Sequence, residues 1–235
     1  AREELIKKGI DTHATIDELT TKTSDLIFGN EILDNIPCSI GLYKDEGWYE
    51  KVVLLEENSL EYGLRPIRNE ELDWINKNNI VPNEDYEFEI QVNIDKFLNS
   101  VIKKINPGKI LLFDYGYEQK NRDKRMYSSL LRTYKNHHLS VDPIDDPGNT
   151  DITYDVNFSS ISSELKYLGY DVTLKLQRDF LLDNGFNIFF DELQEKYIDA
   201  EGIEKLKINS ELNGMKAIVD SNGLGGFYCL IAEKL

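Results

Sequence analysis

Cysteine and histidine are scarce in this 235-residue chain, which has two cysteines and three histidines. Cys38 and Cys229 lie far apart in the sequence and match neither a zinc-binding spacing nor a redox motif. We therefore expect reduced, inert thiols and no metal site. Long apolar runs are also missing. No stretch approaches the roughly 20 apolar residues of a membrane-spanning helix, and the first residues contain no apolar signal core, so we expect no membrane partner.

Positive charge is in short supply. The chain has 27 Lys and Arg residues against 43 Asp and Glu residues, which gives a formal net charge of −16. Such a surface repels phosphate backbones, so nucleic acid is not an expected partner. The charge suits a basic protein or peptide segment, although acidity can equally serve only to keep the protein soluble.

Several well-known catalytic motifs are missing as well. The chain contains no Walker loop, no HExxH zinc motif and no GxSxG nucleophile motif, so ATPase, zinc-protease and serine-hydrolase functions lack support. The glycine-rich segment 223–226 precedes an apolar run, whereas a phosphate-binding loop follows a strand and opens a helix. We predict a tight turn there.

The hydrophobic pattern alternates between strand-like and helix-like segments, which favours an α/β fold. Two helices are expected to begin at asparagine caps, Asn69 and Asn93. Two more are expected over 158–168 and over 180–197, the latter with a break at 184–185. The polar segment 117–150 is predicted to be a long loop. Six segments read as strands: 25–28, 48–55, 86–92, 109–114, 170–176 and 227–232.

Two carboxylates follow the first apolar strand. If the segment from Asn30 is helical, Glu31 and Asp34 lie on one face, where they could grip a guanidinium group. An ordinary, solvated first helical turn explains the same acidic pair. Asp114 and Tyr115 end the second buried strand, and ligands gather at such strand ends in α/β sheets.

A second group of candidates lies further along the chain. Arg132, His137 and Asp151 could converge on one site if the segment between them folds back. Adjacent histidines in a loop are more often surface residues than metal ligands, and the remaining histidine, His13, is remote. The residues by themselves leave both readings open.

Taken in order, these motifs and several others resemble the MidA-type methyltransferase family. Its mitochondrial members are protein-arginine methyltransferases required for assembly of respiratory complex I. The matching residues are Asn30-Glu31, Asp34, Pro37, Gly47-Trp48-Tyr49-Glu50, Val52, Asp114-Tyr115-Gly116, Leu131-Arg132, Tyr134, His137, Pro147-Gly148, Asp151-Ile152-Thr153, Val156-Asn157-Phe158, Gln177, Phe180-Leu181, Gly185, Gly223-Leu224-Gly225 and Phe227.

The resemblance implies a single methyltransferase domain over residues 1–235. Its fold would be α/β, a Rossmann-like class I methyltransferase sheet with an inserted, substrate-facing segment at about 41–95. The family's glycine-rich cofactor loop and the acidic residue after its second strand are not recognisable before Asp25, so the N-terminal strands are expected to be missing. The sheet edge exposed in this way could pair with a second copy, which would give a homo-oligomer.

The resemblance also implies a function. The cofactor would be S-adenosyl-L-methionine and the partner a protein substrate with an exposed arginine. The location would be the cytoplasm in a bacterium or the mitochondrial matrix in a eukaryote. Catalytic roles would fall to Glu31, Asp34 and Asn30, while Asp114, Tyr115, Arg132, His137 and Asp151 would shape the site. The alternative is a non-catalytic protein of this fold that binds a partner or assists assembly.

Overall fold

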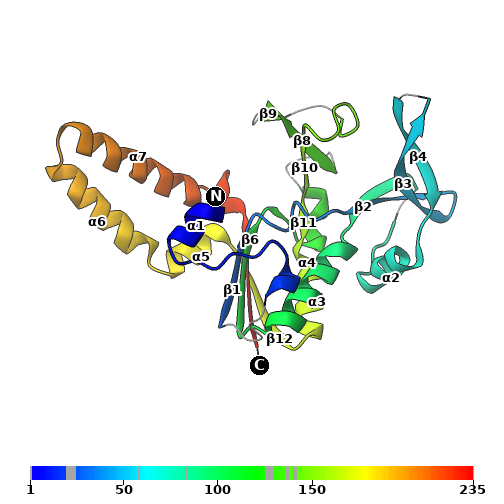
Figure 1. Ribbon diagram of the computed structural model, residues 1–235, viewed down its shortest axis with the longest axis horizontal. Coiled ribbons are helices and arrows are strands. Elements are labelled where there is room, and N and C mark those ends of the chain that lie inside the picture. Colours follow the sequence, from blue (N-terminus) through cyan, green and yellow to red (C-terminus); the bar gives the residue numbers. More distant parts are fainter. Residues whose placement is uncertain are drawn as a thin grey trace.

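The computed structural model of the protein describes residues 2–19, 25–57, 59–82, 84–124, 130–135, 138–139 and 142–234. A four-stranded sheet forms the centre of the molecule (Figure 1). β1 and β6 are parallel, whereas β13 runs antiparallel to both of its neighbours. In sheet order, the strands are β1 (Leu26–Asn30), β6 (Lys109–Asp114), β13 (Tyr228–Lys234) and β12 (Tyr170–Leu176).

Helices cover both faces of this sheet. α3 (Val92–Ile105) and α4 (Phe158–Tyr167) pack on one face, where alternate residues of β6, Ile110 and Leu112, join the main core. Phe113 points to the other face, and its ring packs against that of Phe180 at a centroid distance of 5.4 Å. A strand that is covered on both faces reads as a continuous apolar run, so the predicted strand 109–114 is confirmed.

The prediction of a buried strand at 25–28 is only partly right. β1 forms, but among the described strands it pairs with β6 alone and so lies at an edge of the sheet. Ile27 packs against the core, while Leu26 is exposed and Phe28 is 61% exposed on the opposite face. An apolar run indicates that a strand is compatible with burial, but it does not show that neighbouring elements cover the strand.

A second, fully antiparallel sheet follows β1 in the chain. Its strands, in order, are β4 (Ser59–Pro66), β3 (Gly47–Glu56), β2 (Ser39–Lys44) and β5 (Tyr86–Ile90). α2 (Asn69–Lys77) packs on it through Trp74 and Ile75 against Phe88 and Ile90. The strand at 86–92 was expected to be half-buried, yet Glu89 is also fully buried. That residues of about 41–95 form a separate inserted segment stays a prediction.

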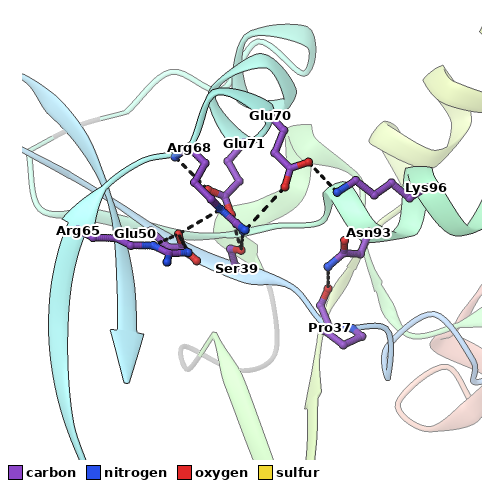
Figure 2. Close-up of polar contacts among 9 residues, drawn as sticks. All are labelled: Pro37, Ser39, Glu50, Arg65, Arg68, Glu70, Glu71, Asn93 and Lys96. Carbon is purple, nitrogen blue, oxygen red and sulfur yellow. Dashed lines mark hydrogen bonds and ion pairs between the residues drawn. The ribbon is translucent and has the colours of Figure 1, made fainter. Parts of the chain in front are cut away.

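A balanced set of charges, here called the Arg68 network, stabilises this region (Figure 2). Arg68 contacts the carboxylates of Glu50, Glu70 and Glu71. Arg65 pairs with Glu50 at 2.6 Å. Lys96 on α3 reaches Glu70 on α2 at 2.7 Å, which ties the second sheet to the helices of the first. Ser39 completes the network by donating its hydroxyl hydrogen to Glu71 at 2.7 Å.

Both predicted helix caps are displaced by one or two residues. Arg68 occupies the cap position of α2, so Asn69 is the first helical residue. Gln91 occupies the cap position of α3, and Asn93 instead donates from its amide to the carbonyl of Pro37 at 2.8 Å (Figure 2). The preference of asparagine for cap positions is a local property, and the side chain of Asn93 makes a tertiary hydrogen bond in place of a cap.

The predicted long loop at 117–150 is wrong. It contains a 3₁₀ segment, η2 (Gln119–Lys124), and parts of two small sheets. β8 (Leu131–Lys135) pairs with β9 (His138–Leu139) and with β10 (Asp151–Tyr154), while β7 (Gly116–Tyr117) pairs with β11 (Val156–Asn157). These strands have two to five residues, which is too short for a periodic pattern to reveal them.

The C-terminal part adds a helical hairpin that projects from the sheet (Figure 1). α5 (Gln177–Asp183) ends at the predicted break, where Gly185 has φ +92°, and α6 (Phe186–Asp199) follows. α7 (Gly202–Val219) was not anticipated from the sequence; it packs along α6.

The remaining short elements are α1 (Arg2–Lys7), η1 (Ile16–Glu18) and η3 (Leu224–Gly226). Among the described residues, no helix combines the length and apolar character needed to cross a membrane.

Candidate functional site

A cavity of about 1050 Å³ opens beyond the C-terminal ends of β1 and β6. Its walls come from four places: the loop after β1, the segment after β6, the small β8–β10 sheet with its flanking residues, and the turn before β13. In an open α/β sheet, ligands bind at this edge. The lining residues are Glu31, Asp34, Asn35, Tyr115, Gly116, Arg132, Tyr134, Asn149, Asp151, Thr153, Asp155, Ser221, Asn222, Gly223, Leu224, Gly226 and Phe227.

The loop after β1 is not the helix that the sequence suggested. The N–H of Glu31 donates to the carbonyl of Phe113 at 2.9 Å and so continues the β1–β6 pairing. The N–H groups of Leu33 and Asp34 both donate to Oδ2 of Asp114, at 2.9 and 3.3 Å. A side chain from the neighbouring strand thus takes the place of helical carbonyls, and the chain turns instead of coiling.

Glu31 has an unusual backbone conformation at the rim of the cavity. Its φ is +49°, in the left-handed region that non-glycine residues rarely adopt. The side chain is exposed, and the amide of Asn30 donates to its Oε1 at 3.2 Å. Backbone strain of this kind concentrates at functional sites, so the geometry motivates a functional test of this residue.

Asp34 is buried in the cavity wall and is saturated with hydrogen bonds. Its Oδ1 accepts from the amide of Asn35 at 2.7 Å. Its Oδ2 accepts from the hydroxyl of Thr153 at 2.7 Å and from the hydroxyl of Tyr115. Glu31 and Asp34 therefore line one cavity in different ways: Glu31 is presented to solvent, while Asp34 fixes the side chains around it.

Asp114 lies directly beneath this wall and is fully buried. Burial, and then the charge of Asp34, raise the pKa of Asp114 to about 7, although three backbone N–H groups favour its charged form. The third of these donors is the N–H of Tyr115, which reaches Oδ1 at 2.9 Å. Asp114 thus holds together the two loops that follow β1 and β6.

Arg132 and Asp155 form a buried ion pair in the part of the wall that the small sheet contributes. Nη1 of Arg132 lies 2.8 Å from Oδ1 of Asp155, and its guanidinium group sits 5.1 Å from the centroid of the Tyr115 ring. Because Asp155 already balances this cation, the carboxylates of Glu31, Asp34 and Asp151 leave the cavity with an excess of negative charge. Such a cavity attracts cations.

The structure brings together most of the residues singled out from the sequence. Glu31, Asp34, Tyr115, Arg132 and Asp151 line the cavity. Asn30 contacts Glu31, and Asp114 supports the wall from below. His137 lies outside the described residues. Within the described ranges, no three His, Cys, Asp or Glu side chains are grouped so that they could hold a metal ion. The roles of these residues stay predictions.

Sequence reasoning identified Asp151 but missed other lining residues. Thr153 and Asp155 follow Asp151 at intervals of two residues, and a period of two places them on one face of an extended chain, so their grouping with Asp151 was detectable. The segment 223–226 was predicted to be only a tight turn, yet together with Ser221, Asn222 and Phe227 it forms a wall of the cavity. Gly225 is required there by close packing, since an added Cβ would lie 2.4 Å from the carbonyl carbon of Val219. Contacts of this kind leave no periodic signal.

Comparison with known proteins is consistent with this geometry. Two crystal structures from Burkholderia thailandensis share the fold, each with a TM-score of 0.78. One is a protein bound to S-adenosyl-homocysteine, 22% identical over 92% of this chain, and the other is an uncharacterized protein of the same superfamily, 23% identical over 93%. This chain spans 55% and 57% of their lengths.

A protein-family model gives the stronger assignment. The model described as "Putative S-adenosyl-L-methionine-dependent methyltransferase" matches residues 6–173, which is more than half of the chain. The matched range includes both parallel strands, the loop after β1 and the small sheet, and therefore most of the cavity wall. The chain belongs to this S-adenosyl-L-methionine-dependent methyltransferase family.

Proposed function

We propose that this chain acts in S-adenosylmethionine-dependent methylation of a nitrogen on a protein side chain, with arginine as the acceptor, as in MidA-type enzymes. The observation that carries the proposal is the acidic cavity at the strand ends, with the exposed carboxylate of Glu31 at its rim. A guanidinium group is a planar cation with several N–H donors, and carboxylates bind it through paired hydrogen bonds.

The residues of the cavity fit the cofactor. A volume of about 1050 Å³ is at the upper end of ordinary ligand sites and leaves room for a cofactor and an acceptor side chain. S-adenosylmethionine, when bound, supplies an electrophilic methyl group on a positively charged sulfur. Carboxylates and aromatic faces both stabilise such a cation, and Glu31, Asp151, Tyr115 and Phe227 present them in the lining.

Glu31 is the residue proposed to contact the acceptor. Its carboxylate is exposed at the cavity rim, and the amide of Asn30 orients it. An oxygen of Glu31 accepts hydrogen bonds from the guanidinium N–H groups and so fixes the direction of the attacking nitrogen. Positioning of this kind is a large part of what an enzyme contributes to a direct displacement.

Asp34 is proposed to act through Tyr115 and not by direct contact. Its oxygens already accept hydrogen bonds from Asn35, Thr153 and Tyr115. The ring of Tyr115 is fixed between Asp34, the guanidinium of Arg132 and the ring of Phe227, at 5.4 Å between ring centroids. A rigid aromatic wall excludes water from the reacting groups, which strengthens the electrostatic contacts there.

Two measurements test the proposal. Calorimetry with S-adenosyl-homocysteine should give saturable binding, and incubation with S-adenosylmethionine and arginine-containing peptides should add methyl mass to arginine. Glu31→Gln should lower the rate about 100-fold or more while the far-UV spectrum is unchanged.

Glu70→Gln, in the Arg68 network, is the matched control and should leave the rate unchanged. Full activity in Glu31→Gln would contradict the role of this residue. No binding of S-adenosyl-homocysteine by a folded chain would favour the non-catalytic, partner-binding alternative.

A further inference from the structure

The β3–β4 hairpin carries an apolar face that is largely exposed, although one of its side chains, Tyr62, is hydrogen-bonded to Asp142. Directly opposite residues of an antiparallel pair project to the same side, and the register places Val53 opposite Tyr62 and Leu55 opposite Leu60. Leu64 lies two residues further along and shares this side. Val53, Tyr62 and Leu64 are exposed, and Leu55 is 75% exposed. These five residues are called the hairpin face.

The opposite side of the hairpin is already occupied. Glu50 and Arg65 pair with each other on that side, where Arg68 and α2 lie (Figure 2). Leu54 also projects there and packs over Gly63, where an added Cβ would come within 2.4 Å of it. The hairpin face is therefore the solvent side of a sheet whose inner side is stabilised. Monomeric proteins seldom leave so many apolar side chains contiguous and exposed without a use for them.

The backbone beside this face is also available. Among the described strands, β4 pairs with β3 alone, so it is an edge strand of eight residues (Figure 1). An edge strand presents N–H and C=O groups to any extended chain that can reach them. A bound strand would extend the sheet and place alternate side chains on the same side as the hairpin face, next to the β4 residues of that face.

The surroundings of the hairpin face are acidic. The hydroxyl of Tyr62 donates to Asp142, and the nearby carboxylates of Asp142, Asp145 and Glu87 add to burial in raising the pKa of Tyr62. Lys51 lies 5.1 Å from the centroid of the Tyr62 ring, but Glu87 balances it at 2.9 Å.

Acidic residues also lie in the hairpin itself: Glu57 is in its turn, and Glu56 and Glu61 are on its strands, where the register directs them to the side opposite the hairpin face. A second copy of this chain would place like charges opposite one another, whereas a segment rich in Lys or Arg would complement them.

The hairpin face is connected to the cavity through the small sheet. Asp142, which holds Tyr62, lies in the connection between β9 and β10. β10 contributes Asp151 and Thr153 to the cavity lining. A chain that covers the hairpin face would thus lie next to the connection that leads into β10.

We propose that the hairpin face and the β4 edge bind an extended segment of the methyl-accepting protein, one that alternates apolar residues with Lys or Arg. This inference rests on the proposed function for the identity of the occupant, but the docking surface itself rests on the contacts above. Binding there would hold the acceptor near the cavity independently of the contact with Glu31. Residues of the substrate that are remote from the reacting nitrogen would then determine which proteins are methylated.

A fluorescein-labelled peptide of about ten residues that alternates lysine with valine is a suitable probe, because this length matches one strand. It should bind saturably without cofactor and protect the amides of β4 from hydrogen exchange. Leu55→Ser combined with Leu64→Ser should weaken binding about tenfold or more, since two exposed leucines lose their contacts. Val81→Ser removes an equally exposed apolar residue outside the hairpin face and should change nothing.

Four results would overturn the inference. The first is equal binding of the probe to the double variant, and the second is equal binding of a peptide with glutamate in place of lysine. The third is protection of β1, the matched edge strand of the central sheet, in place of β4. The fourth is a concentration-dependent dimer that the double variant abolishes, because the occupant would then be a second copy of this chain.

The link to methylation needs its own measurement. With an arginine added to the probe, the double variant should raise KM about tenfold and leave kcat unchanged, because it removes binding outside the reacting groups. A fall in kcat with KM unchanged would contradict the docking role. Binding of the probe without any methylation of the arginine peptide would refute the proposed function while leaving the docking surface in place.

Discussion

Asp114 under the cavity wall and Glu71 in the Arg68 network are both fully buried, yet their pKa values are shifted in opposite directions. Asp114, under the cavity, has another carboxylate near it, and its pKa is raised to about 7. Burial also tends to raise the pKa of Glu71, but hydrogen bonds from Arg68 and Ser39 outweigh it, and the pKa is lowered. Matched charges stabilise the fold of the second sheet, whereas the excess of acid around the cavity leaves it ready for a cation.

Asp114→Asn should show the largest effect, through the pH dependence of stability. Between about pH 4 and pH 7, the folded state holds a proton on Asp114 that the unfolded state has released, so this residue destabilises the fold increasingly as pH rises. Asparagine cannot ionise. The free energy of unfolding of the variant, relative to the natural chain, should therefore rise by on the order of 4 kcal/mol between pH 4 and pH 8.

Urea titrations at several pH values would measure this difference. A constant difference between the two proteins across that range would show that Asp114 ionises at an ordinary pKa. The comparison with Glu71 would then lose its basis.

Glu71→Gln should have the next largest effect, with the opposite dependence on pH. The change leaves Arg68 without its buried partner and should lower the free energy of unfolding by about 2 kcal/mol at pH 7. Because the pKa of Glu71 is lowered, its contribution is present above the unfolded pKa and disappears as pH falls through the folded value. The difference between variant and natural chain should shrink below about pH 4.

Activity separates the two regions again. The rate per folded molecule should be unaffected in Glu71→Gln, because the Arg68 network does not line the cavity. A loss of methyl transfer that exceeds the loss of folded protein would mean that the Arg68 network takes part in the reaction. The division between the two regions would then be wrong.

The smallest expected effect compares two strained glutamates. Glu31 has φ +49°, and Glu46, in the tight turn between β2 and β3, has φ +60°. Glycine adopts this region without a steric penalty, so Glu31→Gly and Glu46→Gly should each raise the free energy of unfolding by about 0.5 to 1 kcal/mol. Only Glu31→Gly should lose methyl transfer, because it also removes the carboxylate proposed to contact the acceptor. Thermal unfolding would show whether the two strained positions cost the fold similar amounts, and equal activity of the two variants in the peptide assay would contradict the role of Glu31.

Much of the central sheet was predictable because its signals are local. The apolar run at 109–114, the strand at 170–176 and the break at 184–185 agree with β6, β12 and the start of α6. Gly169, with φ +86°, follows α4 as expected. In each case a hydrophobic period or a glycine within a few residues is enough to predict the element or its end.

The site was less predictable because it is made by residues that are distant in sequence. Asp34 meets Tyr115 and Thr153, which are 81 and 119 positions away. The helix expected after Asn30 does not form, because Asp114 supplies acceptors for its backbone N–H groups. A pattern within ten residues cannot anticipate a partner from another strand.

The sequence by itself determined the alternation of strands and helices, the acidity of the surface and the resemblance to a methyltransferase family, because composition and period are properties of the chain alone. Tertiary structure decided which strands lie at an edge and which carboxylates are balanced by cations. It also decided that Glu31 is presented to the cavity while Asp34 is enclosed. Burial and charge pairing depend on neighbours that only the folded chain brings within a few ångströms, and these neighbours set both the pKa of Asp114 and the opening of the cavity.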